Sequence, residues 1–322
     1  MTSPTPENTT VRWWRPALTA CLTGSPAPFP YSQRWGYRQH SWRHPADGGF
    51  HAPDFEVVRL PEHLARGFVT RHHYAASFPA ARFSYALTTT DDRLAIDGAT
   101  VAGRALVGVA VLSVPMRAAV LTNVFPDLEP NAQALELGRL VLTDTPANAE
   151  SWFLRRVFEH AATEGIRGIV SFSDPMPRTR TTVDPDGHDR TEQFMPGHVG
   201  ICYQATNALA LGRSTRRTLT YLPRHGLVLS DRTLQKVRAQ EAGADAAERR
   251  IVALGARPRR AAETPARWLR DALDELHVTK VRHPGNYRYA WPLGRPAERR
   301  RTRIGLPRTA YPKPDRASLP LF

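Results

Sequence analysis

Residues 134–175, ALELGRLVLTDTPANAESWFLRRVFEHAATEGIRGIVSFSDP, contain the pattern that decides the fold. The first nine residues form an apolar run of strand length, and residues 166–172 form a second run. The segment between them has apolar residues at the helical period, with Asn148 as the expected N-cap and Gly165 at the end. The stretch therefore predicts a strand, a helix and a second strand.

The segments before this stretch add a helix and a β region. Leu64, Phe68 and Val69 have the spacing of one buried helical face. Two β-branched runs, residues 105–114 and 118–124, are separated by a proline and predict a hairpin.

The segments after it are shorter. Residues 176–196 are polar and predict a surface insertion, whereas residues 201–211 have the pattern of a helix. Short strands are expected at 219–222 and 227–229, and further helices after Ser230 and Thr264. The order of these elements predicts an α+β fold with a mixed sheet flanked by helices.

Three parts of the chain differ in composition. Residues 1–55 are rich in Pro, Trp, Arg and His without sustained periodicity, which predicts an irregular N-terminal arm. Residues 56–245 carry the regular patterns and are expected to form the catalytic domain, with 176–196 as its insertion. Residues 246–322 are expected to form a basic helical and aromatic C-terminal extension that contacts DNA.

The positive charge is concentrated in the last third of the chain. Residues 206–322 contain 25 Lys and Arg against 10 Asp and Glu, whereas the preceding residues contain 19 against 20. Such an asymmetry is typical of a surface that binds a polyanion, either nucleic acid or an anionic membrane. The alternative is that the positive charge reflects an arginine-rich proteome and belongs to a solvated tail that binds no polyanion.

The chain has only two cysteines, Cys21 and Cys202, without CxxC spacing. This pattern excludes a disulfide framework and a cysteine zinc site. No signal-peptide pattern and no apolar run long enough to span a bilayer is present, so a cytoplasmic protein is expected.

Four clusters contain residue types that can do chemistry. Adjacent histidines can supply a base or a metal ligand, charges on an apolar strand need a partner or a cleft, polar groups at strand ends are often reactive, and glycines before a helix can receive an anion. Each cluster also has a structural interpretation: a cap, a buried ion pair, an Asp-Pro turn or a core tyrosine. In chain order the clusters are His72, His73 and Tyr74; Glu136 and Arg139; Ser171, Ser173 and Asp174; and His198, Gly200, Tyr203 and Asn207.

Taken together, these clusters resemble the Mom family of DNA-modification proteins. The resemblance is carried by HHY at 72–74, ELGRL at 136–140, the 148–151 loop, VSFSDP at 170–175, GHVGICYQATN at 197–207, RTLTYLP at 217–223, LSDRTLQKVR at 229–238 and RHPGNYRYAWPL at 282–293. The family has an acetyltransferase-like (GNAT) fold, in which acyl-CoA enters where the fourth and fifth strands splay apart. It modifies adenine in DNA at N6 to a carbamoylmethyl form, which protects the DNA from restriction.

The resemblance implies roles for individual residues. Arg139, Asp174 and Tyr203 match the family's catalytic arginine, aspartate and tyrosine, and Tyr74 matches its N-terminal HY motif. Asp174 would take a proton from the adenine amine, and Tyr203 would protonate a leaving group. The expected substrate- or donor-binding residues are His72, His73, Glu136, Ser151, Ser171, His198, Gly200 and Asn207.

The donor does not follow from the sequence. The fold suggests acyl-CoA, yet the glycine-spaced pyrophosphate loop is absent at 145–151, and acetyl transfer would not give a CH2 on N6. A metal at His72 or His73 is left open, as is a homodimer.

Double-stranded DNA is the expected partner, and no membrane is. Arginines would contact phosphates and aromatic side chains would stack on an exposed base. The expected DNA-binding residues are Arg282, Tyr287, Arg288, Trp291, Arg299, Arg300 and Arg301. The alternatives are a DNA-binding protein without catalytic activity, and an acyltransferase acting on tRNA or on a protein amine.

Overall fold

The computed structural model describes residues 32–43 and 49–313. The first part of the expected N-terminal arm, with Cys21, lies outside the described residues. The described part of the arm is not wholly irregular. Strands β1 (Ser32–Gly36) and β2 (Gln39–Arg43) form an antiparallel hairpin.

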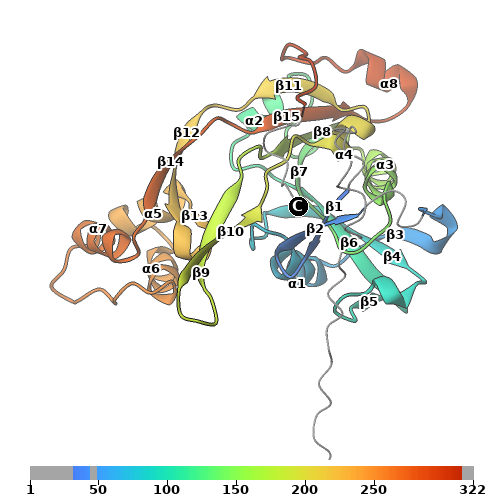
Figure 1. Ribbon diagram of the computed structural model, residues 1–322. Helices are drawn as coiled ribbons and strands as arrows, with labels where there is room; N and C mark the ends of the chain where they lie inside the picture. The colour runs from blue at the N-terminus through green and yellow to red at the C-terminus, as the bar shows by residue number, and fades with distance from the viewer. Residues whose placement is uncertain (1–31, 44–48, 314–322) are drawn as a thin grey trace, which may run out of the picture.

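An eight-stranded mixed sheet forms the centre of the molecule (Figure 1). Its order is β11-β15-β8-β7-β6-β4-β3, and β5 pairs with β6 at one edge. All neighbours are antiparallel except β7 and β8, which are parallel and are joined by helix α3. The bounds are β3 Phe55–Arg59, β4 Ala81–Thr89, β5 Thr100–Val101, β6 Arg104–Ser113, β7 Ala134–Leu142, β8 Gly168–Ser173, β11 Leu209–Arg213 and β15 Tyr287–Pro292.

Helices cover both faces of this sheet because the strands are apolar on both sides. Helix α3 buries Phe153, Leu154 and Val157 in one core, with Leu135 and Leu137 of β7. Helices α1 and α2 contribute to the cores on the opposite face. The bounds of the helices near the sheet are α1 Glu62–His72, α2 Ala119–Thr122, α3 Ala149–Thr163, α4 Ile201–Ala205 and α8 Pro296–Arg301. This arrangement confirms the expected α+β fold with a mixed sheet flanked by helices.

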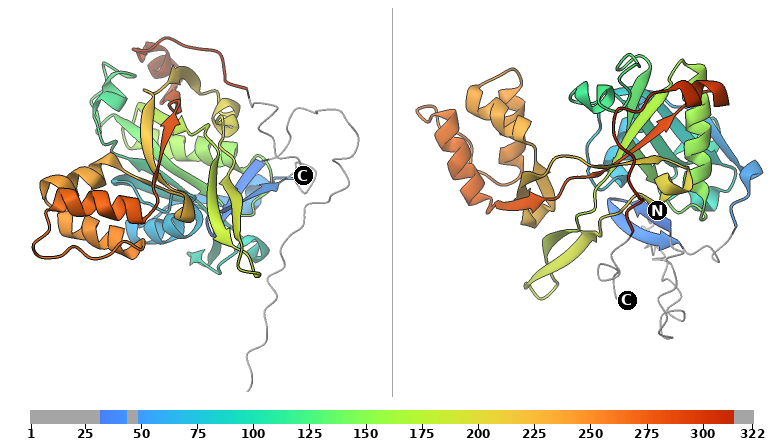
Figure 2. Two further views of the ribbon diagram at one scale, coloured as in Figure 1. Left: turned by 60° about the vertical axis from the view of Figure 1, so that its left-hand side comes forward. Right: turned by 90° about the horizontal axis from the view of Figure 1, so that it is seen from above.

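A separate helical lobe, residues 217–283, lies at one side of the molecule (Figure 2). Its helices pack around their own core, in which Trp268 is fully buried. Its three strands have the order β13-β12-β14. The bounds are β12 Arg217–Leu222, β13 Leu227–Leu229, α5 Asp231–Ala239, α6 Ala244–Ala253, α7 Pro265–Glu275 and β14 Thr279–His283.

The division expected at 245/246 therefore falls inside α6, and β15 from the expected extension lies within the main sheet. Composition changes along the chain, but β11 and β15 of the last third belong to the main sheet. None of the described helices is long and apolar enough to cross a membrane.

The expected surface insertion is a two-stranded hairpin of β9 (Arg178–Val183) and β10 (Asp189–Met195). Three other expectations were wrong. Residues 118–124 are not a strand but contain α2, and the helix expected over 201–211 ends at Ala205, where β11 follows. Leu64 is 42% exposed, because Ala65 takes the buried position on α1.

Candidate active site

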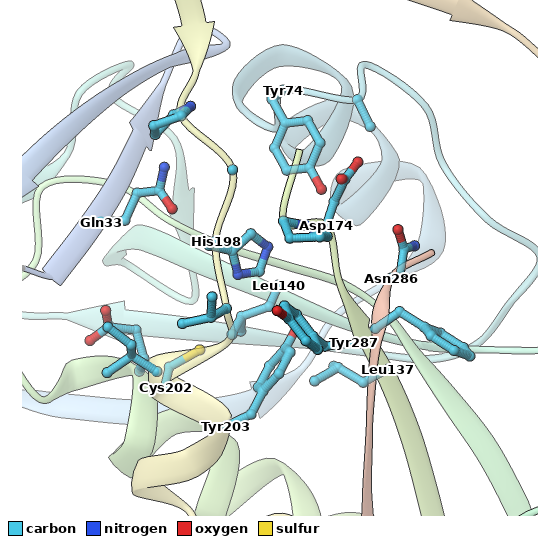
Figure 3. Close-up of a pocket in the computed structure, with 18 of the residues that line it drawn as sticks. Gln33, Tyr74, Leu137, Leu140, Asp174, His198, Cys202, Tyr203, Asn286 and Tyr287 are labelled. Carbon is cyan, nitrogen blue, oxygen red and sulfur yellow. The ribbon is translucent and has the colours of Figure 1, made fainter. Parts of the chain in front are cut away.

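A cavity of about 770 Å³ opens where strands β7 and β8 separate. Their pairing ends at Leu137 and Ser171, although β7 continues to Leu142. The walls come from both faces of the sheet, from the residues that follow α1, such as Tyr74, on one side and from Cys202 and Tyr203 of α4 on the other (Figure 3). This volume lies within the range of small-molecule and cofactor sites.

The structure brings most of the predicted residues together around this cavity. Those that line it are His73, Tyr74, Glu136, Arg139, Ser151, Asp174, His198, Tyr203 and Tyr287. Residues that sequence reasoning missed also line it, among them Arg178, Arg213, Arg217, Asn286 and Cys202.

A β-bulge at Gly138 places the two charged residues of β7 on one face. Val111 of β6 faces Arg139 and Leu112 faces Leu137, so Gly138 is the extra residue. Without the bulge, residues three apart would point to opposite faces of the sheet. A Cβ at Gly138 would lie 2.3 Å from the Ser113 hydroxyl oxygen, so only glycine fits there.

The Arg139 guanidinium is fixed by hydrogen bonds rather than by an ion pair. It donates to the Ser77 carbonyl at 3.0 Å, the Ser77 hydroxyl at 2.8 Å and the Gly138 carbonyl at 2.5 Å. The Glu136 carboxylate forms no hydrogen bond or salt bridge with any described residue, so the alternative of a structural Glu136–Arg139 ion pair does not hold. Burial raises the pKa of Glu136, and the charge of Arg139 opposes that rise.

Asp174, directly after β8, is almost fully buried and has both carboxylate oxygens engaged. Its carboxylate accepts from His283 Nε2 at 2.9 Å, from the Met176 amide at 3.0 Å and from the Arg178 guanidinium. Burial alone would raise the pKa of Asp174, but the hydrogen bond from His283 and the charge of Arg178 lower it well below its usual range. Asp174 therefore stays ionised and holds its neighbours in place.

His283 was missed although it lies in a segment that carried the family resemblance. It is the last residue of β14 and is 1% exposed. Its Nδ1 accepts from the Gly285 amide at 3.0 Å, so a neutral ring carries its proton on Nε2 and donates it to Asp174. Only a fold that brings residue 283 next to residue 174 reveals this pair.

The two adjacent histidines at the end of α1 have different surroundings. His72 lies outside the cavity, bonds to Asp97 at 2.9 Å and accepts from the Tyr37 amide. His73 and Tyr74 line the cavity, and the Tyr74 hydroxyl faces the Asp174 carboxylate (Figure 3). Burial, and secondarily the charge of Arg139, keeps the pKa of His73 well below its usual value. His73 is therefore neutral.

Helix α4 supplies Tyr203 but no anion site at its N-terminus. Burial raises the pKa of Tyr203 strongly, so its hydroxyl remains protonated against Ser171. Ser171 itself donates to the Leu137 carbonyl at 3.0 Å, in the core. Gly200 has a positive φ of 76° and precedes a helix of five residues, so it acts through backbone geometry. Asn207 is exposed and lies at a different hollow.

The aromatic residues expected to bind DNA differ in accessibility. Trp291 is 4% exposed and packs in the core edge-to-face with Tyr203, so the expectation that it stacks on a base was wrong. Tyr287 lines the cavity. Arg288 is half-buried over Phe172, whereas the other expected arginines are exposed, namely Arg282, Arg299, Arg300 and Arg301.

The loop before α3 does not fit the pyrophosphate of acyl-CoA. Arg34 from the N-terminal hairpin is 1% exposed and donates to the carbonyls of Thr145 at 2.8 Å and Pro146 at 2.6 Å. It also binds the Glu150 carboxylate at 2.5 Å. These two carbonyls and the Glu150 carboxylate are thus taken up by Arg34, and residues 145–151 lack the glycine-spaced pattern of a pyrophosphate loop. Asn148 has a φ of 72° and its side chain caps nothing, contrary to expectation.

A metal site at the histidines has no support from the donor set. The described residues contain no group of three or more His, Cys, Asp or Glu able to hold a metal ion. His72 and His73 use ring nitrogens for hydrogen bonds within the protein.

Comparison with known proteins agrees with this geometry. Residues 54–182 match the model of the Mom protein family. Over this range the chain is similar to the Mom family. The matched range includes Tyr74, Glu136, Arg139 and Asp174, and ends before Tyr203. The similarity favours a transferase that modifies DNA.

Two other comparisons complete the result. No curated protein matches the chain. Among solved structures, the chain is similar to a tandem GNAT protein from the clavulanic acid biosynthesis pathway, determined without AcCoA. The identity is 12% and the TM-score 0.27, over 60% of this chain and 62% of that one.

Proposed function

We propose that the protein transfers a carbamoylmethyl group to N6 of adenine in double-stranded DNA and thereby protects the DNA from restriction enzymes. The observation that carries the proposal is the cavity between the splayed strands. It unites Arg139, Asp174, Tyr203 and Tyr74, the residues that correspond to the family's catalytic positions.

The cavity suits a base that has left the duplex. N6 is hydrogen-bonded and stacked within DNA, so chemistry on it requires an extruded nucleotide at a cost of about a few kcal/mol. The half-buried Tyr287 ring can stack on such a base, and Asn286 beside it offers an amide for hydrogen bonds.

Positive charge extends from the cavity toward the helical lobe. Arg213 and Arg217 line the cavity, and Arg282 follows on the neighbouring strand β14. None of these three forms an ion pair with a described residue, so their charges are available to DNA phosphates. Affinity is expected to fall with salt and to depend little on sequence.

The residues around the reacting atoms have distinct tasks. Arg139 presents a fixed cation to an anionic group of the donor, and Tyr203 presents a protonated hydroxyl. Asp174 holds Arg178 and His283, which fixes the end of β8 against the cavity.

The test is nucleoside mass spectrometry of plasmid DNA from cells that express the chain. Wild type is expected to yield an adenosine species heavier by one carbamoylmethyl group, and plasmid DNA resistant to enzymes that cut at adenine-containing sites. Arg139→Lys is expected to lose the species because a lysine cannot reproduce the three hydrogen bonds.

The matched control is Arg155→Lys, an exposed arginine of α3 outside this cavity, which should modify DNA like wild type. Unmodified DNA despite abundant folded wild-type protein would contradict the proposal. The same digest of tRNA would then test for an RNA substrate.

A further inference from the structure

The half-buried Glu136 lines the cavity, and its carboxylate has no partner among the described residues. The backbone carbonyl of Glu136 accepts a hydrogen bond from the Ser113 hydroxyl at 3.4 Å, but no described residue bonds to the Glu136 side chain. A partly desolvated carboxylate without a partner, lining a cavity, is typical of functional sites. The bulge at Gly138 keeps this carboxylate on the cavity face together with Arg139.

Arg139 does not neutralise it. The guanidinium is held by the Ser77 and Gly138 oxygens and forms no salt bridge with Glu136. Burial is the largest influence on the Glu136 carboxyl and raises its pKa, so it binds a proton more readily than an exposed glutamate does.

The other proton acceptors of the cavity are less suitable. Asp174 is occupied by His283, Arg178 and the Met176 amide, and its pKa is lowered. His73 accepts from the Ala75 amide through Nδ1 at 3.1 Å, so its Nε2 carries the proton and cannot accept another.

His198 forms no side-chain hydrogen bond with a described residue. A proton on its ring would create a positive charge, whereas a proton on Glu136 neutralises a negative one. Burial lowers the pKa of His198, although the charge of Asp174 opposes that fall, so accepting a proton there creates an unfavourable buried cation. A proton on Glu136 instead removes a charge from the cavity wall.

We propose that Glu136, rather than Asp174, is the general base of the transfer, positioned by the Gly138 bulge to accept a proton from the N6 amine. This inference rests on the proposed function.

The step balances with a donor of one chemical class, an electrophile in which a carbamoylmethyl group carries a leaving group. The N6 lone pair forms the new N–C bond while the bond from carbon to the leaving group breaks, and the leaving group departs with that electron pair. The N6 proton passes to a Glu136 carboxylate oxygen and from there to water. No oxidant or reductant is needed.

The experiment compares E136Q, E136D and wild type by nucleoside mass spectrometry of plasmid DNA. E136Q keeps the size of the side chain but cannot accept the proton, so the modified fraction should fall by about 100-fold or more. E136D keeps the carboxylate and should retain part of the activity. The matched control is E129Q, an exposed glutamate shortly before β7, which should equal wild type.

A second readout separates base catalysis from a structural role. Unmodified plasmid DNA is incubated with purified protein in a cell extract that supplies the donor, from about pH 5 to pH 8. The wild-type rate should fall on the acid side as Glu136 is protonated, and the residual rate of E136Q should lack this fall.

Each outcome is decisive. Wild-type modification by E136Q overturns the inference alone, as does an acid-side fall that vanishes in His198→Gln but not in E136Q. If E136Q does not fold, a wild-type rate without an acid-side fall overturns it. A wild-type chain that yields no modified adenine overturns the proposed function and this inference with it.

Discussion

The carboxylates of Asp174 and Glu136, at the two parallel strands in the centre of the sheet, differ in whether they have hydrogen-bond partners. Strand β8 is directly followed by Asp174, whose carboxylate oxygens are both engaged, by a histidine, an arginine and an amide. Strand β7 carries Glu136, whose oxygens meet no described partner. Two acidic residues in one cavity can thus differ completely in availability, and the difference depends on what the rest of the chain brings to each strand.

The largest effect is expected from Asp174→Ala, which removes the partner of two buried groups. Arg178 and His283 would lose their shared acceptor, lowering the free energy of unfolding by about 3–5 kcal/mol. DNA modification should be lost as well. Urea unfolding and nucleoside mass spectrometry measure both effects. Asp174→Asn keeps an acceptor for His283 and should be milder; equal stability of Asp174→Ala and wild type would contradict a structural role.

Arg34→Ala tests the loop that follows β7. The substitution leaves the Glu150 carboxylate and two loop carbonyls without their donor, and should destabilise by about 3 kcal/mol. The double variant Arg34→Met/Glu150→Met removes both charges and should recover most of the loss in urea unfolding. A single variant as stable as wild type would show that the hairpin does not fix this loop.

Gly138→Ala tests the bulge that makes Glu136 available. The new Cβ would meet the Ser113 hydroxyl, so we expect a loss of about 1–3 kcal/mol and lower DNA modification. Ser113→Ala combined with Gly138→Ala removes that oxygen and should restore part of the stability. A Gly138→Ala variant with unchanged modification would separate the bulge from the chemistry.

The smallest effect concerns His73, which follows α1 and lines the cavity. Burial lowers the pKa of His73, so below the unfolded-state value of about 6.5 the unfolded chain binds a proton that the folded chain does not. The contribution of neutral His73 to stability is therefore present above the unfolded-state pKa and is lost as the pH falls below it. His73→Gln should flatten the decline between pH 7 and pH 5.5 by about 1 kcal/mol. Exposed His63→Gln is the control, and an identical decline in both variants would contradict the assignment.

The sequence predicted the fold class because the central strands and α3 have strong, regular apolar patterns. It failed at residues 118–124, where β-branched residues lie in a short helix, since local propensity does not decide between the two. Arg139 and Glu136 were identified because charges on an apolar strand need a reason. His283, Arg178 and Arg34 were missed, since their partners are made by tertiary contacts that no periodicity records.

The chain enters and leaves the helical lobe at one place. Arg217 and His283 are opposite one another at the first rung of β12 and β14, so everything between them is a topological insert. Because the lobe has its own core, it can be replaced as a unit without changing the strand order of the main sheet. Among the described residues His283 bonds to Asp174 and Tyr221 bonds to Thr179 of β9, so a chain with another lobe at this joint would keep the site in place only if it kept both contacts.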